Sequence, residues 1–197
     1  AEFLNNAPAV LILGDNIFFG HGLPELLASA SDKQTGATVF GYHVNDPERY
    51  GVLGFDKNGK VNSIIEKPKE PASSHAVTGL YFVDSTAPMR ARQVEPSERG
   101  ELEITSLLES YLMDDNLSVE TMGRGFAWLD TGTHASLLEA SNFVRTLTER
   151  QGLQVGSPDE VAFKFGWISS KTLKASADRY KRSAYGIYLT NLLKQSG

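Results

Sequence analysis

Residues 11–23, LILGDNIFFGHGL, decide the fold: an apolar run stops abruptly at Gly14, Asp15 and Asn16 and then resumes. Val10 to Leu13 has the composition of a strand that is buried on both faces, as in parallel sheets. Ligands of open α/β sheets bind beyond the carboxyl ends of such strands. Asp15 is therefore a candidate ligand-binding carboxylate.

A second carboxylate stands in a matching context. Asp130 follows the apolar run that ends in Trp128 and Leu129, and it precedes Thr-Gly-Thr. Two carboxylates that converge at strand ends predict a shared Mg²⁺, which prefers one or two carboxylates together with phosphate oxygens and water. The other interpretation is that each aspartate caps a turn or a helix through backbone N–H groups. The residues alone leave both interpretations open.

A carboxylate and an ammonium group stand side by side in IIEKPKEP, residues 64–71. Glu66 can accept hydrogen bonds from sugar hydroxyls, and Lys67 can attract a phosphate as a point charge. Gly51 and Gly79, each in a predicted strand, would let a flat ligand approach the backbone closely. The alternative is a solvated surface ion pair, which contributes little to stability or binding.

The composition excludes several kinds of site. Cysteine is absent, which excludes disulfides, thiolate metal sites and a cysteine nucleophile and fits a reducing compartment, so we expect a cytoplasmic protein. The net charge is −5 and Lys and Arg are scattered, which argues against a nucleic-acid surface. No apolar stretch approaches the roughly 18 residues of a membrane helix. No Walker, GxGxxG or GxSxG motif occurs.

Hydrophobic periodicity and turn signals predict an α/β fold. Asn58-Gly59 indicates a hairpin, Gly152 a helix C-cap, and Ser157 with Glu160 a capping box. The predicted strands cover 10–13, 37–44, 51–55, 61–66, 76–83, 117–121 and 126–129. The predicted helices cover 23–30, 104–113, 134–150 and 185–193, with another starting at Ser157. We expect a Rossmann-like mixed, mostly parallel sheet flanked by helices in residues 1–150 and a helical C-terminal subdomain in residues 151–197.

Seven segments, collinear along the chain, resemble the glucose-1-phosphate thymidylyltransferase family of sugar nucleotidyltransferases. The resemblance extends from Phe3 to Leu193. The segments are LGDNIFFGHGL, RYGVLGFD, IIEKPKEP, AVTGLYFVD, RGELEIT, MGRGFAWLDTGTHASLLEAS and GLQVGSPDEVAF. Such a series is far more specific than any single short motif.

The resemblance implies a reaction in which dTTP and α-D-glucose 1-phosphate give dTDP-glucose and pyrophosphate, with Mg²⁺, for dTDP-rhamnose synthesis. It implies that Asp15 and Asp130 bind the metal and that Lys67 holds the sugar phosphate. It also implies that Asp15 and Asn16 bind the nucleotide, with Asn16 beside both the metal and the nucleotide. Asp15, Lys67 and Asp130 would be the catalytic residues. The sugar pocket would be lined by Gly51, Glu66, Lys67, Val77 and Thr78.

The family also has a regulatory nucleotide site between subunits, where dTDP-rhamnose inhibits. Gly20, His21 and Arg124 fall in segments that resemble this site, and Phe19 stands where the family usually has tyrosine. The resemblance also implies a homotetramer that acts on small molecules, without nucleic acid or membrane partners.

The family begins with a glycine-rich GGxGTRL-type loop that binds the triphosphate, and this loop precedes the region that the chain resembles. We therefore expect an N-terminally truncated nucleotidyltransferase fold that is inactive by itself. The alternative is a non-catalytic sugar-nucleotide-binding or regulatory module. The presence of both aspartates with Glu66 and Lys67 favours the enzyme, because a module without chemistry has little need of all four.

Overall fold

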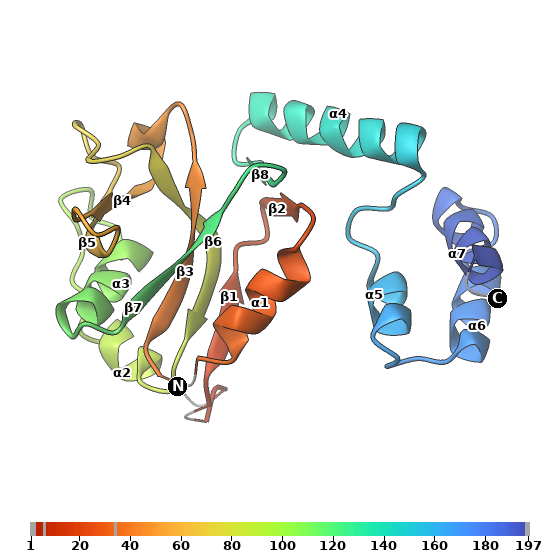
Figure 1. Cartoon of the computed structure of the whole chain (residues 1–197), viewed down its shortest axis with the longest axis horizontal. Helices are drawn as coiled ribbons and strands as arrows, with labels where there is room; N and C mark the ends of the chain where they lie inside the picture. The colour runs from red at the N-terminus through yellow and green to blue at the C-terminus, as the bar shows by residue number, and fades with distance from the viewer. Residues whose placement is uncertain (1–2, 6, 34, 196–197) are drawn as a thin grey trace. The chain divides into compact units, whose positions relative to one another are not determined.

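The computed structural model describes residues 3–5, 7–33 and 35–195 (Figure 1). Its contacts divide the chain into two compact units, residues 1–131 and 132–197, here called the first unit and the second unit. The long helix α4 (His134–Gln151) belongs with the C-terminal helices in this division, whereas the sequence placed it with the preceding part.

The first unit is built on a mixed sheet with the strand order β5-β4-β6-β3-β7, in which β1 also pairs with β6. Its strands are β1 (Ala9–Ile12), β3 (Ala37–His43), β4 (Gly51–Phe55), β5 (Val61–Glu66), β6 (His75–Val83) and β7 (Leu117–Met122). The predicted mixed α/β fold is confirmed. The sheet is less parallel than predicted, because β3 and β7 form the one parallel pair among the described strands.

Helices cover both faces of this sheet (Figure 1). On one face, Leu107, Leu108 and Tyr111 of α3 (Ile104–Met113) pack on Val39 and Tyr81. On the other face, α1 (Leu23–Ser31) packs on a cluster that contains Phe40, Leu80 and Met122. Alternate residues of β3 and β6 thus enter opposite cores, as the strand period of two requires. The 3₁₀ helix η1 (Pro47–Arg49) and helix α2 (Ala87–Ala91) complete the unit.

The first strand corrects the expectation of burial on both faces. β1 is a strand, but Val10 is 55% exposed and Ile12 is 57% exposed. Its register pairs it with the C-terminal half of β6, and its other edge meets no strand among the residues that the structure describes. Its apolar side chains therefore lack the covering layers that the pattern predicted.

The hairpin between β4 and β5 follows its turn chemistry. The carboxylate of Asp56 accepts hydrogen bonds from the backbone N–H groups of Asn58 and Lys60, at 2.8 and 2.9 Å. Gly59 has φ of +79°, a left-handed conformation that glycine adopts without steric cost. The turn sets the register in which Gly51 lies opposite Glu66.

The second unit is helical. It contains α4, α5 (Pro158–Lys164), α6 (Ser170–Arg179) and α7 (Ala184–Gln195), with Leu173, Ala177 and Leu189 at the centre of its core. Gly152 caps α4 at φ of +66°, and the hydroxyl of Ser157 accepts from the Glu160 N–H at the start of α5, as predicted. The carboxylate of Glu160 is used differently, because it accepts from the Tyr188 hydroxyl.

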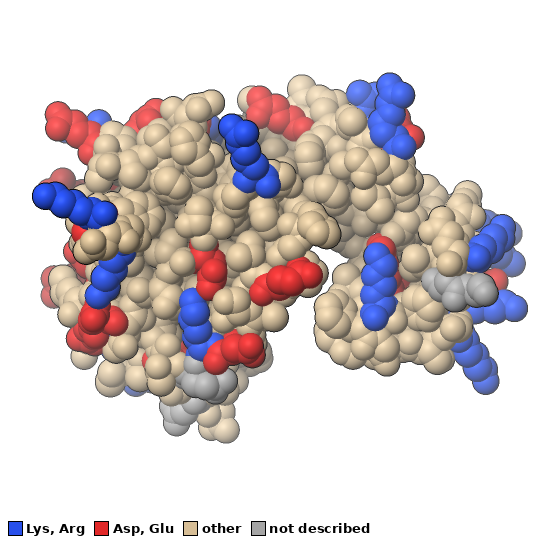
Figure 2. Space-filling model, viewed as in Figure 1, with Lys and Arg blue, Asp and Glu red and all other residues tan. Residues whose placement is uncertain are grey.

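Charge is distributed unequally between the units. Lys and Arg outnumber Asp and Glu in residues 132–197, whereas the reverse holds in residues 1–131. Figure 2 shows basic side chains projecting from the helices of the second unit. No described helix is both long enough and apolar enough to cross a membrane.

Asp84 ties the end of β6 to the loop before β3 and to α3. Its carboxylate accepts from the N–H groups of Gly36 and Thr86, at 2.7 and 2.9 Å, and from the Tyr111 hydroxyl at 3.0 Å. Burial by itself raises the pKa of Asp84, but the hydrogen bonds from Thr86, Gly36 and Tyr111 outweigh it and hold the pKa below its usual value. The ionised carboxylate therefore stabilises the first unit.

We expect Asp84→Asn to lower the free energy of unfolding of the first unit by about 2 kcal/mol, because it leaves partly buried donors without an acceptor. Since the folded pKa is depressed, this stabilisation is present above the ordinary aspartate pKa and is lost as the pH falls through the folded value. Urea unfolding of a Trp167→Phe background measures it, because the fluorescence of Trp128 then reports on the first unit alone. The exposed Asp32→Asn is the control, and equal effects of the two variants would contradict the assignment.

Candidate functional site

A cavity of about 220 Å³ in the first unit collects most of the predicted site residues. It is lined by Leu13, Asp15, Asn16, Arg49, Tyr50, Gly51, Glu66, Lys67, Val77, Gly79, Tyr81, Ile104, Thr105, Trp128 and Asp130. These residues come from strands of the sheet, from the start of α3, from η1, from a separate two-stranded ribbon and from the turns next to these strands. The ribbon consists of β2 (Asn16–Phe19) and β8 (Ala127–Asp130).

The ribbon brings the two predicted metal ligands to one end. β2 and β8 pair antiparallel, with Asn16 opposite Asp130, so that Asp15 and Asp130 lie at neighbouring ends of adjacent strands. The carbonyl oxygen of Asp15 accepts from the N–H and the hydroxyl of Thr131, at 2.9 and 2.8 Å. Both carboxylates therefore border the same cavity, as the two matching strand ends predicted.

The side chain of Asn16 is engaged on both sides. Its Oδ1 accepts from Trp128 Nε1 at 2.6 Å and from the N–H of Gly79 at 3.0 Å. Its Nδ2 donates to Asp15 Oδ1 at 2.9 Å. The sequence placed Asn16 at the nucleotide, and the structure shows that most of its hydrogen-bonding capacity is used inside the protein.

Aromatic rings form one wall of the cavity. The ring of Trp128 lies 5.0 Å from that of Tyr50 and 5.9 Å from that of Tyr42, both measured between centroids. Trp128 is 8% exposed, so that its indole is held by packing as well as by its hydrogen bond. Aromatic surface of this kind suits the apolar face of a ring-shaped ligand.

Lys67 has a backbone conformation that the sequence did not predict. Its φ is +41°, which is uncommon for any residue other than glycine, and the following Pro68 further restricts it. Its N–H donates to the carbonyl oxygen of Tyr50 at 2.9 Å, which holds the turn in place. Strain of this kind is concentrated at functional sites. The conformation supports a specific role for the Lys67 side chain.

Glu66, at the end of β5, lies among charged neighbours. Burial and the nearby carboxylate of Glu103 raise the pKa of Glu66, and the hydrogen bond from Thr105 offsets this only in part. Arg99 Nη1 lies 3.8 Å from Glu66 Oε1, as does Lys67 Nζ. Arg99, which stands in the motif RGELEIT, was not predicted as a site residue.

Basic groups near the cavity matter because the first unit is acidic. Lys67 and Arg49 line the cavity, and Arg99 is ion-paired to its edge through Glu66. The hydrogen bond to Asp46 is the main cause that raises the pKa of Arg49, and the charge of Asp130 adds to it. An anionic ligand would therefore meet local cations.

Of the predicted sugar-pocket residues, Thr78 is the exception. Gly51, Glu66, Lys67 and Val77 line the cavity, but Thr78 does not. It is fully buried, and because side chains alternate along a strand it lies on the opposite face from Val77. Gly51 is needed at its position, since a Cβ there would lie 2.7 Å from the side chain of Thr105.

The donor set fits Mg²⁺. Within the described residues, no group of three or more His, Asp and Glu side chains could hold a metal ion by itself. Mg²⁺ does not require such a cage, because it is commonly bound by one or two carboxylates with water and substrate phosphates as the other ligands. Asp15 and Asp130 at the end of a cavity that contains Lys67 and Arg49 meet this description.

The three residues assigned to a regulatory site lie at the other end of the ribbon. Gly20 and His21 follow β2, and Arg124 precedes β8, whereas the two aspartates lie at the opposite strand ends. A Cβ at Gly20 would lie 2.4 Å from the ring of Phe126, so that the backbone approaches this ring closely. The regulatory assignment stays a prediction.

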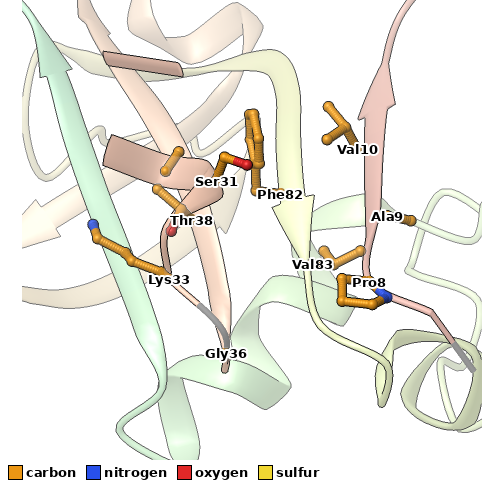
Figure 3. A pocket seen from close by; sticks show the side chains of 10 residues that line it. Pro8, Ala9, Val10, Ser31, Lys33, Gly36, Thr38, Phe82 and Val83 are labelled. Atoms are coloured by element: carbon orange, nitrogen blue, oxygen red, sulfur yellow. The ribbon is translucent and has the colours of Figure 1, made fainter. Parts of the chain in front are cut away.

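A second cavity, of about 190 Å³, lies between β1 and the end of α1 (Figure 3). Pro8, Val10, Ser31, Lys33 and Phe82 are among its lining residues. None of the predicted site residues borders it. Its lysine is already paired, because Lys33 Nζ lies 2.8 Å from Glu120 Oε1.

Comparison with known proteins gives a consistent result. A family model described as "Nucleotidyl transferase" matches residues 1–146. A glucose-1-phosphate thymidylyltransferase from Xanthomonas campestris pv. campestris is 55% identical over 98% of this chain and 66% of its own length. A protein of the same name from Neisseria gonorrhoeae is 50% identical over 98% of this chain and 67% of its own length. Another, from Mycobacterium tuberculosis, is 47% identical over 100% of this chain and 68% of its own length. The chain thus spans about two thirds of the length of these relatives.

Solved structures agree with this fold. A crystal structure from Bacillus anthracis, described as a "Putative Glucose-1-Phosphate Thymidylyltransferase" in complex with sucrose, has a TM-score of 0.64 at 42% identity. The match covers 73% of this chain and 57% of that one. A UDP-glucose pyrophosphorylase in complex with UDP-glucose also has a TM-score of 0.64, at 22% identity over 74% of this chain and 59% of its own, which supports the fold alone. The chain belongs to the nucleotidyl transferase family.

Proposed function

We propose that the whole protein forms dTDP-glucose and pyrophosphate from dTTP and α-D-glucose 1-phosphate, and that this chain carries the sugar pocket and the metal ligands. The observation that carries the proposal is the single cavity that joins Asp15 and Asp130 to Glu66 and Lys67. Carboxylates for a cation and a Glu-Lys pair for a sugar phosphate thereby occupy one site. The names of relatives at up to 55% identity support the same reaction.

In this reaction a phosphate oxygen of glucose 1-phosphate attacks the α-phosphorus of dTTP in line. The new P–O bond forms as the bond to the β-phosphate oxygen breaks, and pyrophosphate leaves with its electron pair. Such chemistry depends mainly on positioning and on charge stabilisation. Bound Mg²⁺ would offset the charge that develops on the phosphates. Asp15 and Asp130 would hold the ion.

The remaining residues position the sugar. Glu66 accepts hydrogen bonds from glucose hydroxyls, and Lys67 attracts the phosphate that attacks. Gly51 and Val77 let the sugar approach the sheet, and Trp128 provides an apolar wall. The position of the Lys67 side chain supports this arrangement, because Lys67 lines the cavity with Glu66 and its Nζ lies 3.8 Å from Glu66 Oε1.

The proposal includes the setting of the enzyme. Its product would enter dTDP-rhamnose synthesis in the cytoplasm, and the protein would work as a homotetramer. Gly20, His21 and Arg124 would contribute to a regulatory nucleotide site. The grouping of these three residues at one end of the ribbon supports a common role for them.

We expect Asp15→Ala and Asp130→Ala each to lower the turnover of the whole protein by roughly 100-fold or more, because each removes a ligand of the cation. Release of pyrophosphate from dTTP in the presence of glucose 1-phosphate and Mg²⁺ measures it, and Asp32→Ala serves as an exposed control. Near-normal Mg²⁺-dependent rates in either variant would contradict the metal assignment. No pyrophosphate from the unaltered protein, with tight binding of dTDP-glucose, would favour the non-catalytic module.

Lys67→Ala is expected to raise the KM for glucose 1-phosphate by roughly tenfold or more and to change the KM for dTTP little, since the lost ammonium contacts the sugar phosphate. Steady-state kinetics with each substrate varied in turn separates the two effects. The neighbouring exposed Lys69→Ala is the matched control. An equal change for both substrates would be incompatible with the role given to Lys67.

The affinity for glucose 1-phosphate is expected to fall on acidification at a pH above the ordinary glutamate value, because the pKa of Glu66 is raised by burial and by Glu103. Protonation removes a charged acceptor for the sugar hydroxyls. Calorimetric titration of the chain at several pH values measures the affinity. The variant Glu66→Gln, whose amide does not titrate, corrects for titration of the phosphate of glucose 1-phosphate. The ratio of the affinity of the unaltered chain to that of Glu66→Gln should approach unity at low pH, because Glu66 is then neutral as well. A constant ratio would refute the role of ionised Glu66.

A further inference from the structure

We infer that Asn16 is a positioning residue that orients the carboxylate of Asp15 toward the divalent cation. This inference rests on the proposed function, because it concerns the metal ligand of that site. It goes beyond the place beside the metal and the nucleotide that the family resemblance implies for Asn16, because it assigns the side chain a specific action on Asp15. It is carried by the hydrogen bonds of the Asn16 amide and by the packing of Gly79.

The direction of the amide is set by its neighbours. Two N–H donors, from Trp128 and from Gly79, point at one atom of the Asn16 side chain, at 2.6 and 3.0 Å. That atom must be the carbonyl oxygen, since an amide nitrogen has no acceptor capacity. The amide nitrogen therefore faces Asp15, and its N–H donates to Asp15 Oδ1 at 2.9 Å.

The backbone next to this amide is held by further hydrogen bonds. The N–H of Gly79 donates to Asn16, and the carbonyl oxygen of Gly79 accepts from the N–H of Leu13 at 2.8 Å. A Cβ at Gly79 would lie 2.6 Å from Asn16 Oδ1 and 2.9 Å from the Leu13 side chain. Glycine at this position lets the turn that carries Asp15 lie directly on β6.

The backbone of Asp15 is held independently of its side chain. Thr131 donates twice to its carbonyl oxygen. Asp15 is nevertheless exposed, so that its carboxylate would turn freely about its side-chain bonds without a partner. The Asn16 N–H occupies one oxygen of that carboxylate and thereby orients the group. Partners that orient metal ligands in this way commonly change metal affinity by 10- to 100-fold.

The same amide also connects the two ends of the cavity. Trp128 and Gly79, which hold its oxygen, line the part of the cavity proposed to receive the sugar. Asp15, which takes its N–H, lies at the metal end. Asn16 thus links the wall of the sugar pocket to the orientation of a metal ligand through one planar group.

The test uses the full 197-residue chain and Mn²⁺ as the metal probe, because electron paramagnetic resonance reports free Mn²⁺ directly. The variants are Asn16→Ala, which removes the donor to Asp15, and Trp128→Phe, which keeps an aromatic side chain and the Gly79 N–H but loses the indole N–H, one of the two donors to the amide oxygen. Asn62→Ala, an exposed asparagine of β5, is the control. Metal-free titration with glucose 1-phosphate reports separately whether the cavity of Asn16→Ala is intact, and circular dichroism reports folding.

We expect Asn16→Ala to weaken Mn²⁺ binding by about tenfold or more, Trp128→Phe to weaken it by a smaller factor, and Asn62→Ala to leave it unchanged. The metal-free affinity of Asn16→Ala for glucose 1-phosphate should fall by a smaller factor than its affinity for Mn²⁺, because Trp128 stays held by packing, whereas the Asp15 carboxylate loses the N–H that orients it. A merely structural role would lower both affinities alike. Unchanged Mn²⁺ affinity in Asn16→Ala, or an equal fall in both affinities, would overturn the inference. If Asn16→Ala does not fold, Trp128→Phe decides, and unchanged Mn²⁺ affinity there overturns it.

The outcome for the unaltered chain separates this inference from the proposed function. If the unaltered chain takes up no Mn²⁺, the metal assignment of Asp15 and Asp130 fails and the positioning role fails with it. If the unaltered chain takes up Mn²⁺ and Asn16→Ala does so equally well, only the positioning role is lost.

Discussion

The pairing of β2 with β8 is the interaction on which the site depends. These two short strands lie far apart in the chain, and their antiparallel register sets Asn16 opposite Asp130. The turn before β2 is in turn attached to β6 through Leu13 and Asn16, both of which bond to Gly79. Without this ribbon, Asp15 and Asp130 would be two unrelated residues at the ends of separate segments.

The other end of the cavity is built by local geometry. The hairpin of β4 and β5 sets Gly51 opposite Glu66, and the left-handed turn at Lys67 follows immediately. The N–H of Lys67 returns to Tyr50, whose ring packs on Trp128 of the ribbon. The proposed sugar end and the proposed metal end therefore share an aromatic wall. A change in the packing of Trp128 would reach both ends.

Much of this could be predicted from the sequence, because the signals were local. Asn58-Gly59 predicted the hairpin, and Gly152 predicted the end of α4. The apolar runs before Asp15 and Asp130 predicted the two strand ends. The resemblance of seven collinear segments to a known family then implied seven of the residues that line the cavity, namely Asp15, Asn16, Gly51, Glu66, Lys67, Val77 and Asp130. Local patterns of this kind act through backbone conformations that few residues can adopt.

The remainder depends on contacts between distant segments. The double role of Asn16 requires Trp128 and Gly79 as partners, and the exposure of β1 depends on which strands flank it. The short strand β2 was not among the predicted strands, since four residues carry little periodicity. Thr78 is a different case: the period of two along β6 already separates it from Val77, so its exclusion from the cavity could have been deduced.

The charge of the first unit gives a physical reason for the proposed cation at this site. Acidic residues outnumber basic ones there, and the cavity itself contains Asp15, Asp130 and Glu66. A phosphate that enters meets Lys67 and Arg49, but Arg49 is already paired with Asp46, and Lys67 lies 3.8 Å from Glu66. Because these cations are already neutralised in part, the carboxylates of the cavity would still repel an anionic ligand. A divalent ion between the two aspartates and the phosphates would convert that repulsion into attraction, because it places positive charge between two sets of negative oxygen atoms.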